Sequence, residues 1–228
     1  EKHIALYPKE REGYINKIIS LLTLKDYESA IEVSIESLNI FPNDFDINYF
    51  LGIAYYSTEK FIEAESYYAK SLKIDNDSIA AMHGLAMAYD KNKKWEKSDQ
   101  LYIDLIARNT KDAQAYNNYA YSLVERNEEI DYALTLAEKA IQLSPKTSPY
   151  LDTIGWIYFK LGNLEKAKEF IAESIVYDDS SAVVLEHYGD VLIALEEKDE
   201  ALIFYKKALE LDQDNSALSE KISSYENQ

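Results

Sequence analysis

The sequence predicts an all-α solenoid in which antiparallel helix pairs follow one another along the chain. Small residues recur with a period of 34 residues, as at Gly155 and Gly189. After Gly155 the helical pattern breaks, and a second apolar helical face follows through Leu164, Ala167 and Ile171. Glycine (6) and proline (4) are scarce, while tyrosine (20) is abundant. A repeat of this length is typical of stacked helical hairpins, and the composition favours helices with short connections.

A repeating frame that begins at Arg11 divides the chain into six predicted hairpins. Residues 1–10 are interpreted as the end of a preceding repeat or an N-terminal extension, because Pro8 stands where Pro42 stands in the next unit. We therefore expect the full-length protein to extend further toward its N-terminus. The fourth unit needs one extra residue in its turn between Glu125 and Asp131. The six units span residues 11–44, 45–78, 79–112, 113–147, 148–181 and 182–215.

Residues 216–228 are predicted to form a capping helix and a short tail. Leu218, Ile222 and Tyr225 fall on one side of this helix, and charged residues fall elsewhere. A solenoid exposes an apolar face at its last repeat, and such a helix covers it.

Small residues at two positions of each unit allow its two helices to approach closely, because interiors are packed densely. The eighth position of the unit is small in five of six units, and the twentieth is small in all six. The eighth-position residues are Ile18, Gly52, Ala86, Ala120, Gly155 and Gly189, and the twentieth-position residues are Ala30, Ala64, Ser98, Ala133, Ala167 and Ala201.

The charge of the chain limits the classes of partner. A net charge of −17 repels phosphate backbones and anionic lipids, so neither nucleic acid nor an acidic membrane is an expected partner. No apolar run approaches the length of roughly 18 residues that spans a bilayer. A basic or apolar protein surface is the better match, and homo-oligomerisation stays open.

No pattern indicates catalysis, a metal or a cofactor. The three histidines, His3, His83 and His187, are far apart along the repeats, so we expect ordinary partly exposed side chains rather than a zinc site. Two acidic turns, at residues 75–78 and 212–216, resemble the start of a calcium loop but lack its glycine and its last acidic ligand. No nucleophile and base form a local signature. The sequence therefore gives no support to serine-type catalysis, zinc or calcium, and we expect no enzyme.

The recurring features together resemble the tetratricopeptide repeat family across residues 11–215. They are the Leu-Gly pair, the tyrosine three residues after it, the paired alanines, and the proline or aspartate between hairpins. The resemblance implies a right-handed superhelix that binds proteins or peptides without catalysis. The stretch from Tyr116 through Trp156 is also similar to a subset common in bacterial proteins, often exported ones. Localisation therefore stays open between the periplasm or envelope and the cytoplasm.

The first helix of each hairpin is expected to line the concave side of the solenoid. The face turned away from the partner helix lies at the second, fifth, ninth and twelfth positions of each unit. This face is richer in aromatic residues than a solvated face requires, which is typical of binding hot spots. The alternative is that some of these residues pack against adjacent helices. The predicted groove residues are Tyr49, Ile53, Tyr56, Met87, Asn117, Tyr121, Asp152, Trp156, Phe159 and Asp190.

The charges of this groove indicate the kind of partner. Family members that grip the carboxylate of a chaperone tail use lysine or arginine where this chain has Asp46, Asp152 and Glu186, so such a clamp is not expected. Acidic groups favour an apolar partner with basic flanks, bound as a helix or an extended peptide. We therefore predict a protein interaction scaffold. Two alternatives stay open: a repeat domain of a larger enzyme or envelope protein, and a homo-oligomerisation module that docks through the first unit or the capping helix.

Overall fold

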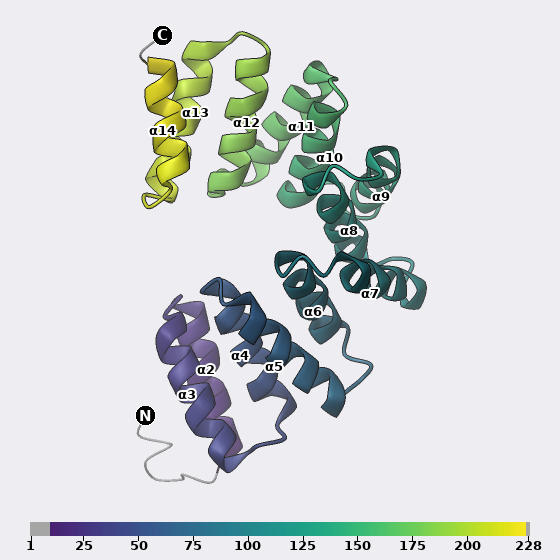
Figure 1. Cartoon of the computed structure of the whole chain (residues 1–228), viewed down its shortest axis with the longest axis vertical. Coiled ribbons are helices and arrows are strands. Elements are labelled where there is room, and N and C mark those ends of the chain that lie inside the picture. Colours follow the sequence, from purple (N-terminus) through teal and green to yellow (C-terminus); the bar gives the residue numbers. More distant parts are fainter. Residues whose placement is uncertain (1–9, 227–228) are drawn as a thin grey trace. The chain divides into compact units, whose positions relative to one another are not determined.

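The structure, a computed structural model, describes residues 10–226 (Figure 1). The described chain forms thirteen helices and contains no strand, which confirms the predicted all-α class of antiparallel helix pairs. The interpretation of residues 1–10 lies outside the described residues, except for Glu10, which directly precedes the first described helix. Within residues 10–226, no helix has both the length and the apolar character needed to cross a bilayer.

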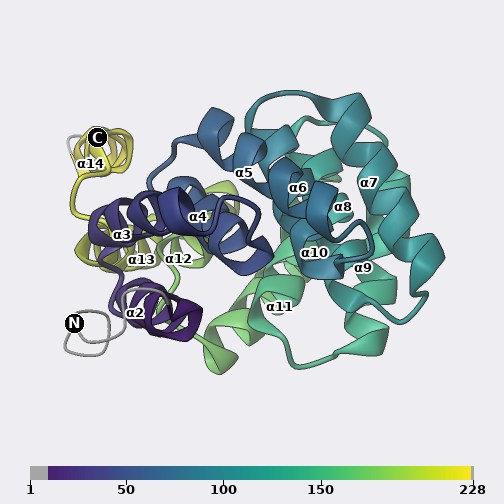
Figure 2. The same ribbon diagram turned by 90° about the horizontal axis from the view of Figure 1, so that it is seen from below.

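The chain divides into two compact units at the connection between Asn109 and Thr110. Unit 1 contains three hairpins, drawn from purple to teal in Figure 1 and seen from below in Figure 2. Its first helices, α2, α4 and α6, contact one another in sequence order, and α3 and α5 each pack on the first helix of the next hairpin. The helices are α2 (Arg11–Thr23), α3 (Tyr27–Ile40), α4 (Phe45–Ser57), α5 (Phe61–Ile74), α6 (Ile79–Lys91) and α7 (Trp95–Arg108).

Unit 2 repeats this arrangement and adds one terminal helix. Helices α8, α10 and α12 contact one another in sequence order and form its first-helix layer, and α14 packs on α13. Leu218 and Ile222 of α14 are buried, and the Tyr225 ring lies 6.3 Å from that of Tyr205. The helices are α8 (Ala113–Glu125), α9 (Ile130–Leu143), α10 (Ser148–Lys160), α11 (Leu164–Tyr177), α12 (Ala182–Ala194), α13 (Lys198–Leu211) and α14 (Ser216–Glu226).

The small residues of the repeat lie at close contacts between helices. A Cβ atom on Gly155 would stand 2.5 Å from Ile171 Cγ1 and 3.2 Å from the backbone oxygen of Ala167. A Cβ atom on Gly189 would stand 2.4 Å from the ring of Tyr205. Any side chain added at either glycine would have to displace these neighbours, so the close-contact prediction is confirmed at both glycines. The small residues at the twentieth position of all six units are fully buried.

Each hairpin turn places the fifteenth residue of its unit in the left-handed backbone region. Only one of the six is glycine, although glycine adopts this conformation most readily. The other turns place a side chain there at a cost in backbone strain. The fourth turn, which has the extra residue, adds Glu129 (φ 43°). The six residues at the fifteenth position are Lys25 (φ 59°), Glu59 (φ 59°), Lys93 (φ 57°), Asn127 (φ 56°), Gly162 (φ 76°) and Glu196 (φ 65°).

Polar residues end one helix and start the next, as the turn sequences indicate. Asp44 accepts a hydrogen bond from the backbone N–H of Ile47 at 3.0 Å, and Asp112 accepts one from Ala115 at 3.1 Å. These caps satisfy backbone donors that the first turn of a helix leaves without partners. The same role is filled by Asp26, Ser78, Asn163 and Ser181.

Candidate functional site

The candidate site lies on the first-helix layer of unit 2, where α8, α10 and α12 bring aromatic and charged side chains together. We call Glu125, Asp152, Trp156, Phe159 and His187 the Trp156 cluster. Asp152, Trp156 and Phe159 share one face of α10 because they are spaced by four and three residues. Glu125 comes from the end of α8 and His187 from α12, so three consecutive hairpins contribute to the cluster.

Trp156 is covered by its own chain. Its indole stacks on the imidazole of His187, with ring centroids 4.0 Å apart, and on the ring of Phe159, with centroids 4.8 Å apart. Its Nε1 donates a hydrogen bond to Glu125 Oε1 at 3.0 Å, and Lys160 Nζ lies 4.6 Å from the ring centroid. Only 7% of Trp156 is exposed. The expectation that this ring stands open in a groove is therefore wrong, because the next hairpin supplies an imidazole that covers it.

Asp152 and His187 form a buried pair beside this indole. His187 Nδ1 lies 3.0 Å from both carboxylate oxygens of Asp152, and His187 is 8% exposed and Asp152 5% exposed. Burial lowers the pKa of His187, but the charge and the hydrogen bond of Asp152 outweigh it and raise the pKa above its ordinary value. His187 was expected to be partly exposed, and Asp152 was expected to face a partner. Both expectations are wrong, because the two side chains satisfy each other between α10 and α12.

A second polar group ties the terminal helix to α12. The Tyr205 hydroxyl donates to Asp190 Oδ1 at 2.6 Å, and Lys221 Nζ donates to Asp190 at 2.7 Å and to Glu186 at 2.8 Å. Burial lowers the pKa of Lys221, but the hydrogen bonds to Asp190 and Glu186 outweigh it and raise the pKa. Burial is also the main cause of the raised pKa of Tyr205. Asp190, predicted as a groove residue, therefore also holds α14 in place.

The remaining predicted residues of unit 2 lie on α8. Asn117 is buried, and within residues 10–226 its Oδ1 has no hydrogen-bond partner, while Tyr121 is partly buried. Across this layer, Glu125, Asp152, Glu186 and Asp190 supply four carboxylates. Among the described residues, Lys160 contacts the indole, and Lys221 and a protonated His187 contact these carboxylates. The layer thus combines partly exposed aromatic rings with an excess of negative charge.

Unit 1 holds the other predicted residues, which are apolar or aromatic. Tyr49, Ile53 and Tyr56 of α4 are partly buried and pack against the cluster that contains Tyr68. Burial, with a smaller effect of the Asp90 charge, raises the pKa of Tyr56 to about 12. Met87 of α6 is also partly buried. These four residues belong to one unit, and Asn117, Tyr121, Asp152, Trp156, Phe159 and Asp190 belong to the other.

Sequence reasoning missed His187, Glu125, Lys221 and Tyr205 as members of the site. A usable signal exists, because contacts between first helices of neighbouring hairpins recur at two sequence separations. Trp156 and Glu125 are 31 residues apart, as are Lys221 and Asp190. His187 and Asp152 are 35 residues apart, as are Lys221 and Glu186. Complementary residues at these two separations identify such contacts in a 34-residue repeat.

Within the described residues, no group of three or more histidines, cysteines or acidic residues is placed to hold a metal ion.

Comparison with known proteins returns the family that the repeats resemble. The family model described as tetratricopeptide repeat matches residues 45–78, 148–178 and 182–215. A TPR repeat-containing protein from Methanocaldococcus jannaschii is 26% identical over 216 residues, which cover 87% of this chain and 36% of that protein. The chain spans between 5% and 36% of the length of the first three curated relatives that it matches.

Two solved structures show the same fold. A thermophilic TPR protein from Thermus thermophilus aligns with a TM-score of 0.74 and 20% identity, over 81% of this chain and 100% of that chain. A chain of the APC/C hetero-tetramer Cut9-Hcn1 aligns with a TM-score of 0.78 and 17% identity, over 98% of this chain and 44% of that one. At these identities the likeness concerns the fold alone.

Proposed function

Because the chain belongs to the tetratricopeptide repeat family, we propose that it is a non-catalytic scaffold that binds a peptide or helix of a partner protein on its first-helix layer. Proteins of this family bind other proteins, and the structurally similar Cut9-Hcn1 assembly is itself a hetero-tetramer. A repeat array suits this role because neighbouring hairpins present one extended surface made of equivalent positions.

The observation that supports the proposal most strongly is the chemistry of the first-helix layer in unit 2. Tyr121 and Phe159 are partly exposed there and supply apolar contact area, and Glu125 is exposed beside them. Trp156 lies beneath, so its role is to hold Phe159 and Glu125 in place rather than to contact the partner. Aromatic anchors beside an exposed carboxylate, in a layer with excess negative charge, match a segment with apolar side chains and basic flanks.

A variant series tests the aromatic part of this surface. The probe is a synthetic peptide with a leucine-rich centre flanked by lysines, and its affinity is measured by isothermal titration calorimetry. Tyr121→Ala combined with Phe159→Ala should weaken binding by about tenfold, which corresponds to about 1.4 kcal/mol. Tyr132→Ala combined with Tyr177→Ala is the matched control, because both tyrosines are exposed on second helices. Equal losses of affinity in the two double variants would show that the peptide does not bind on the first-helix layer.

A charge reversal tests the electrostatic part. A highly acidic protein attracts a basic peptide wherever it binds, so the comparison must hold net charge constant. Glu125→Lys should weaken binding more than Glu173→Lys, which changes the net charge equally at an exposed site on α11. If both variants lose the same affinity, the attraction is general and not specific to the Trp156 cluster.

A further inference from the structure

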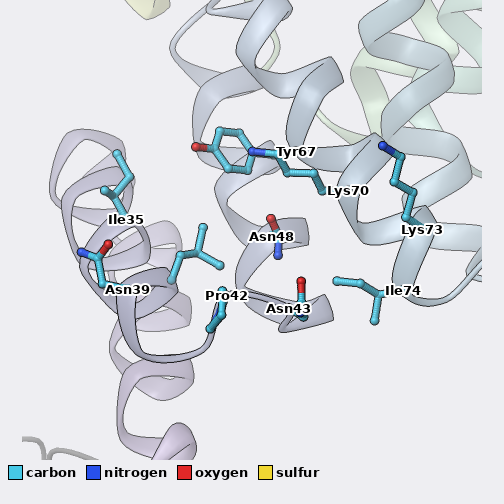
Figure 3. A pocket seen from close by; sticks show the side chains of 10 residues that line it. Ile35, Asn39, Pro42, Asn43, Asn48, Tyr67, Lys70, Lys73 and Ile74 are labelled. Atoms are coloured by element: carbon cyan, nitrogen blue, oxygen red, sulfur yellow. The ribbon is translucent and has the colours of Figure 1, made fainter.

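Unit 1 contains a cleft on its second-helix side, away from the first-helix layer. The cleft has a volume of about 660 Å³ and lies between α3 and α5. Figure 3 shows Ile35 and Asn39 on one wall, Lys70 and Ile74 on the other, and Asn48 of α4 between them. This volume is typical of sites that hold a small ligand or a short peptide.

At the base of the cleft, one large residue of the repeat is replaced by a short polar one. Asn48 is the fourth residue of its unit, a position that is large and apolar in the other five hairpins. Asn48 is buried and its Nδ2 donates to the backbone oxygen of Asp44 at 2.7 Å, so its side chain is held down at the base of the cleft. The residues at the equivalent position are Tyr14, Met82, Tyr116, Leu151 and Leu185.

Two lysines make the rim of this cleft basic in a strongly acidic protein. Lys70 Nζ lies 4.0 Å from the centroid of the Tyr67 ring, and both residues line the cleft. Lys73 follows one turn later on α5, and the cleft lining contains no acidic residue. Within residues 10–226, no carboxylate forms an ion pair with either lysine. No other hairpin has lysine at both of these positions.

We propose that this cleft binds an extended acidic segment of a partner protein, independently of the first-helix layer. Carboxylates of the segment meet Lys70 and Lys73, and an apolar side chain enters between Ile35 and Ile74, which are both exposed. Asn48 Oδ1 makes no hydrogen bond within the described residues, so it accepts one from a peptide N–H. An extended chain has backbone N–H groups available for this bond, because a helix uses its N–H groups for its own backbone hydrogen bonds.

The net charge of the protein does not oppose this assignment at physiological salt. Charges in water are largely screened beyond about 8 Å, so the segment senses mainly the groups that it contacts. Among the described residues, the only charged ones of the cleft lining are the two lysines, and its other polar groups are the Tyr67 hydroxyl and neutral amides. The charges that line the cleft, rather than the net charge of the protein, therefore decide whether an acidic segment is attracted or repelled.

The test is fluorescence anisotropy of a labelled eight-residue peptide, blocked at both ends, in which glutamates alternate with leucines. The full chain should bind this peptide, and a peptide with glutamine in place of glutamate should bind at least about tenfold more weakly. Lys70→Glu combined with Lys73→Glu should weaken binding by about tenfold or more. Lys206→Glu combined with Lys207→Glu is the control, because Lys207 lies over the Phe204 ring as Lys70 lies over Tyr67.

One variant tests the place of binding without changing charge. Asn48→Leu restores the apolar residue of the other hairpins and fills the cleft, so the glutamate peptide should bind about tenfold more weakly while the melting temperature is kept or raised. Unchanged affinity in Asn48→Leu, or an equal loss in the two lysine pairs, overturns the proposal. Equal binding of the glutamine peptide, or no binding to the wild-type chain at about 1 mM peptide, overturns it as well.

Discussion

The contact between Gly155 and α11 provides a quantitative test of how the hairpins are built. In Gly155→Leu, the new Cβ stands 2.5 Å from Ile171 Cγ1 and 3.2 Å from both the backbone oxygen of Ala167 and the backbone nitrogen of Ile171. The Ile171 side chain can rotate, but the backbone of α11 cannot yield without moving the helix. Overpacking of this kind costs up to about 3 kcal/mol, and leucine returns about 0.8 kcal/mol of helix propensity relative to glycine. The net loss should therefore be about 2 kcal/mol.

The assay is urea unfolding followed by far-ultraviolet circular dichroism, performed as a double-mutant cycle with Ile171→Ala. Removing the isoleucine side chain opens the space that the introduced leucine needs, so Gly155→Leu should cost at least about 1 kcal/mol less in that background. A coupling near zero, or an unchanged unfolding midpoint in the single variant, would refute the close-contact account of the repeat.

Three further predictions concern the turns, the buried histidine and the terminal helix. Lys93→Gly should stabilise the chain by about 0.5 kcal/mol, because the relief of left-handed backbone strain exceeds the entropy that glycine adds to the unfolded chain. Gly162→Ala should destabilise the chain by a similar amount. Changes of the opposite sign in urea unfolding would contradict this prediction. Because the pKa of His187 is raised on folding, its pairing with Asp152 stabilises the protein fully below the unfolded pKa of about 6.5 and loses this contribution as the pH rises through the folded value. Unfolding free energies measured from pH 6 upward should therefore fall more steeply in the wild type than in His187→Gln, and parallel curves would exclude the pair as the cause. Ile222→Ala should cost about 2 kcal/mol and speed amide hydrogen exchange in α13, whereas unaltered exchange there would mean that α14 does not stabilise its neighbour.

The hairpins could be predicted from the sequence because their determinants are local and repeated. Gly155 and Gly189 are small because a helix lies against them, and that requirement returns every 34 residues. The turn conformation was less visible. Only Gly162 marks the left-handed position, while Lys93 and Glu196 occupy the same backbone region without any compositional signal.

The exposure of side chains on the first-helix layer was harder to predict, because it depends on pairs of residues from different hairpins. Trp156 has the spacing of an open groove residue, yet His187 of the next hairpin covers it. The sequence around Asp152 predicts a solvated carboxylate, but in the structure the same histidine pairs with it. A search within one unit cannot detect these pairs, whereas the separations of 31 and 35 residues between units can. The break after Asn109 is equally invisible, because the repeat frame continues through it.

The most direct test of the proposed function is hydrogen–deuterium exchange of the full chain with and without the lysine-flanked leucine peptide. Binding on the first-helix layer should slow exchange in α8, α10 and α12 around Tyr121 and Phe159, with little change in α9 and α11. Protection that appears only on the second helices, or none at saturating peptide, would contradict the assignment of this layer as the partner-binding surface.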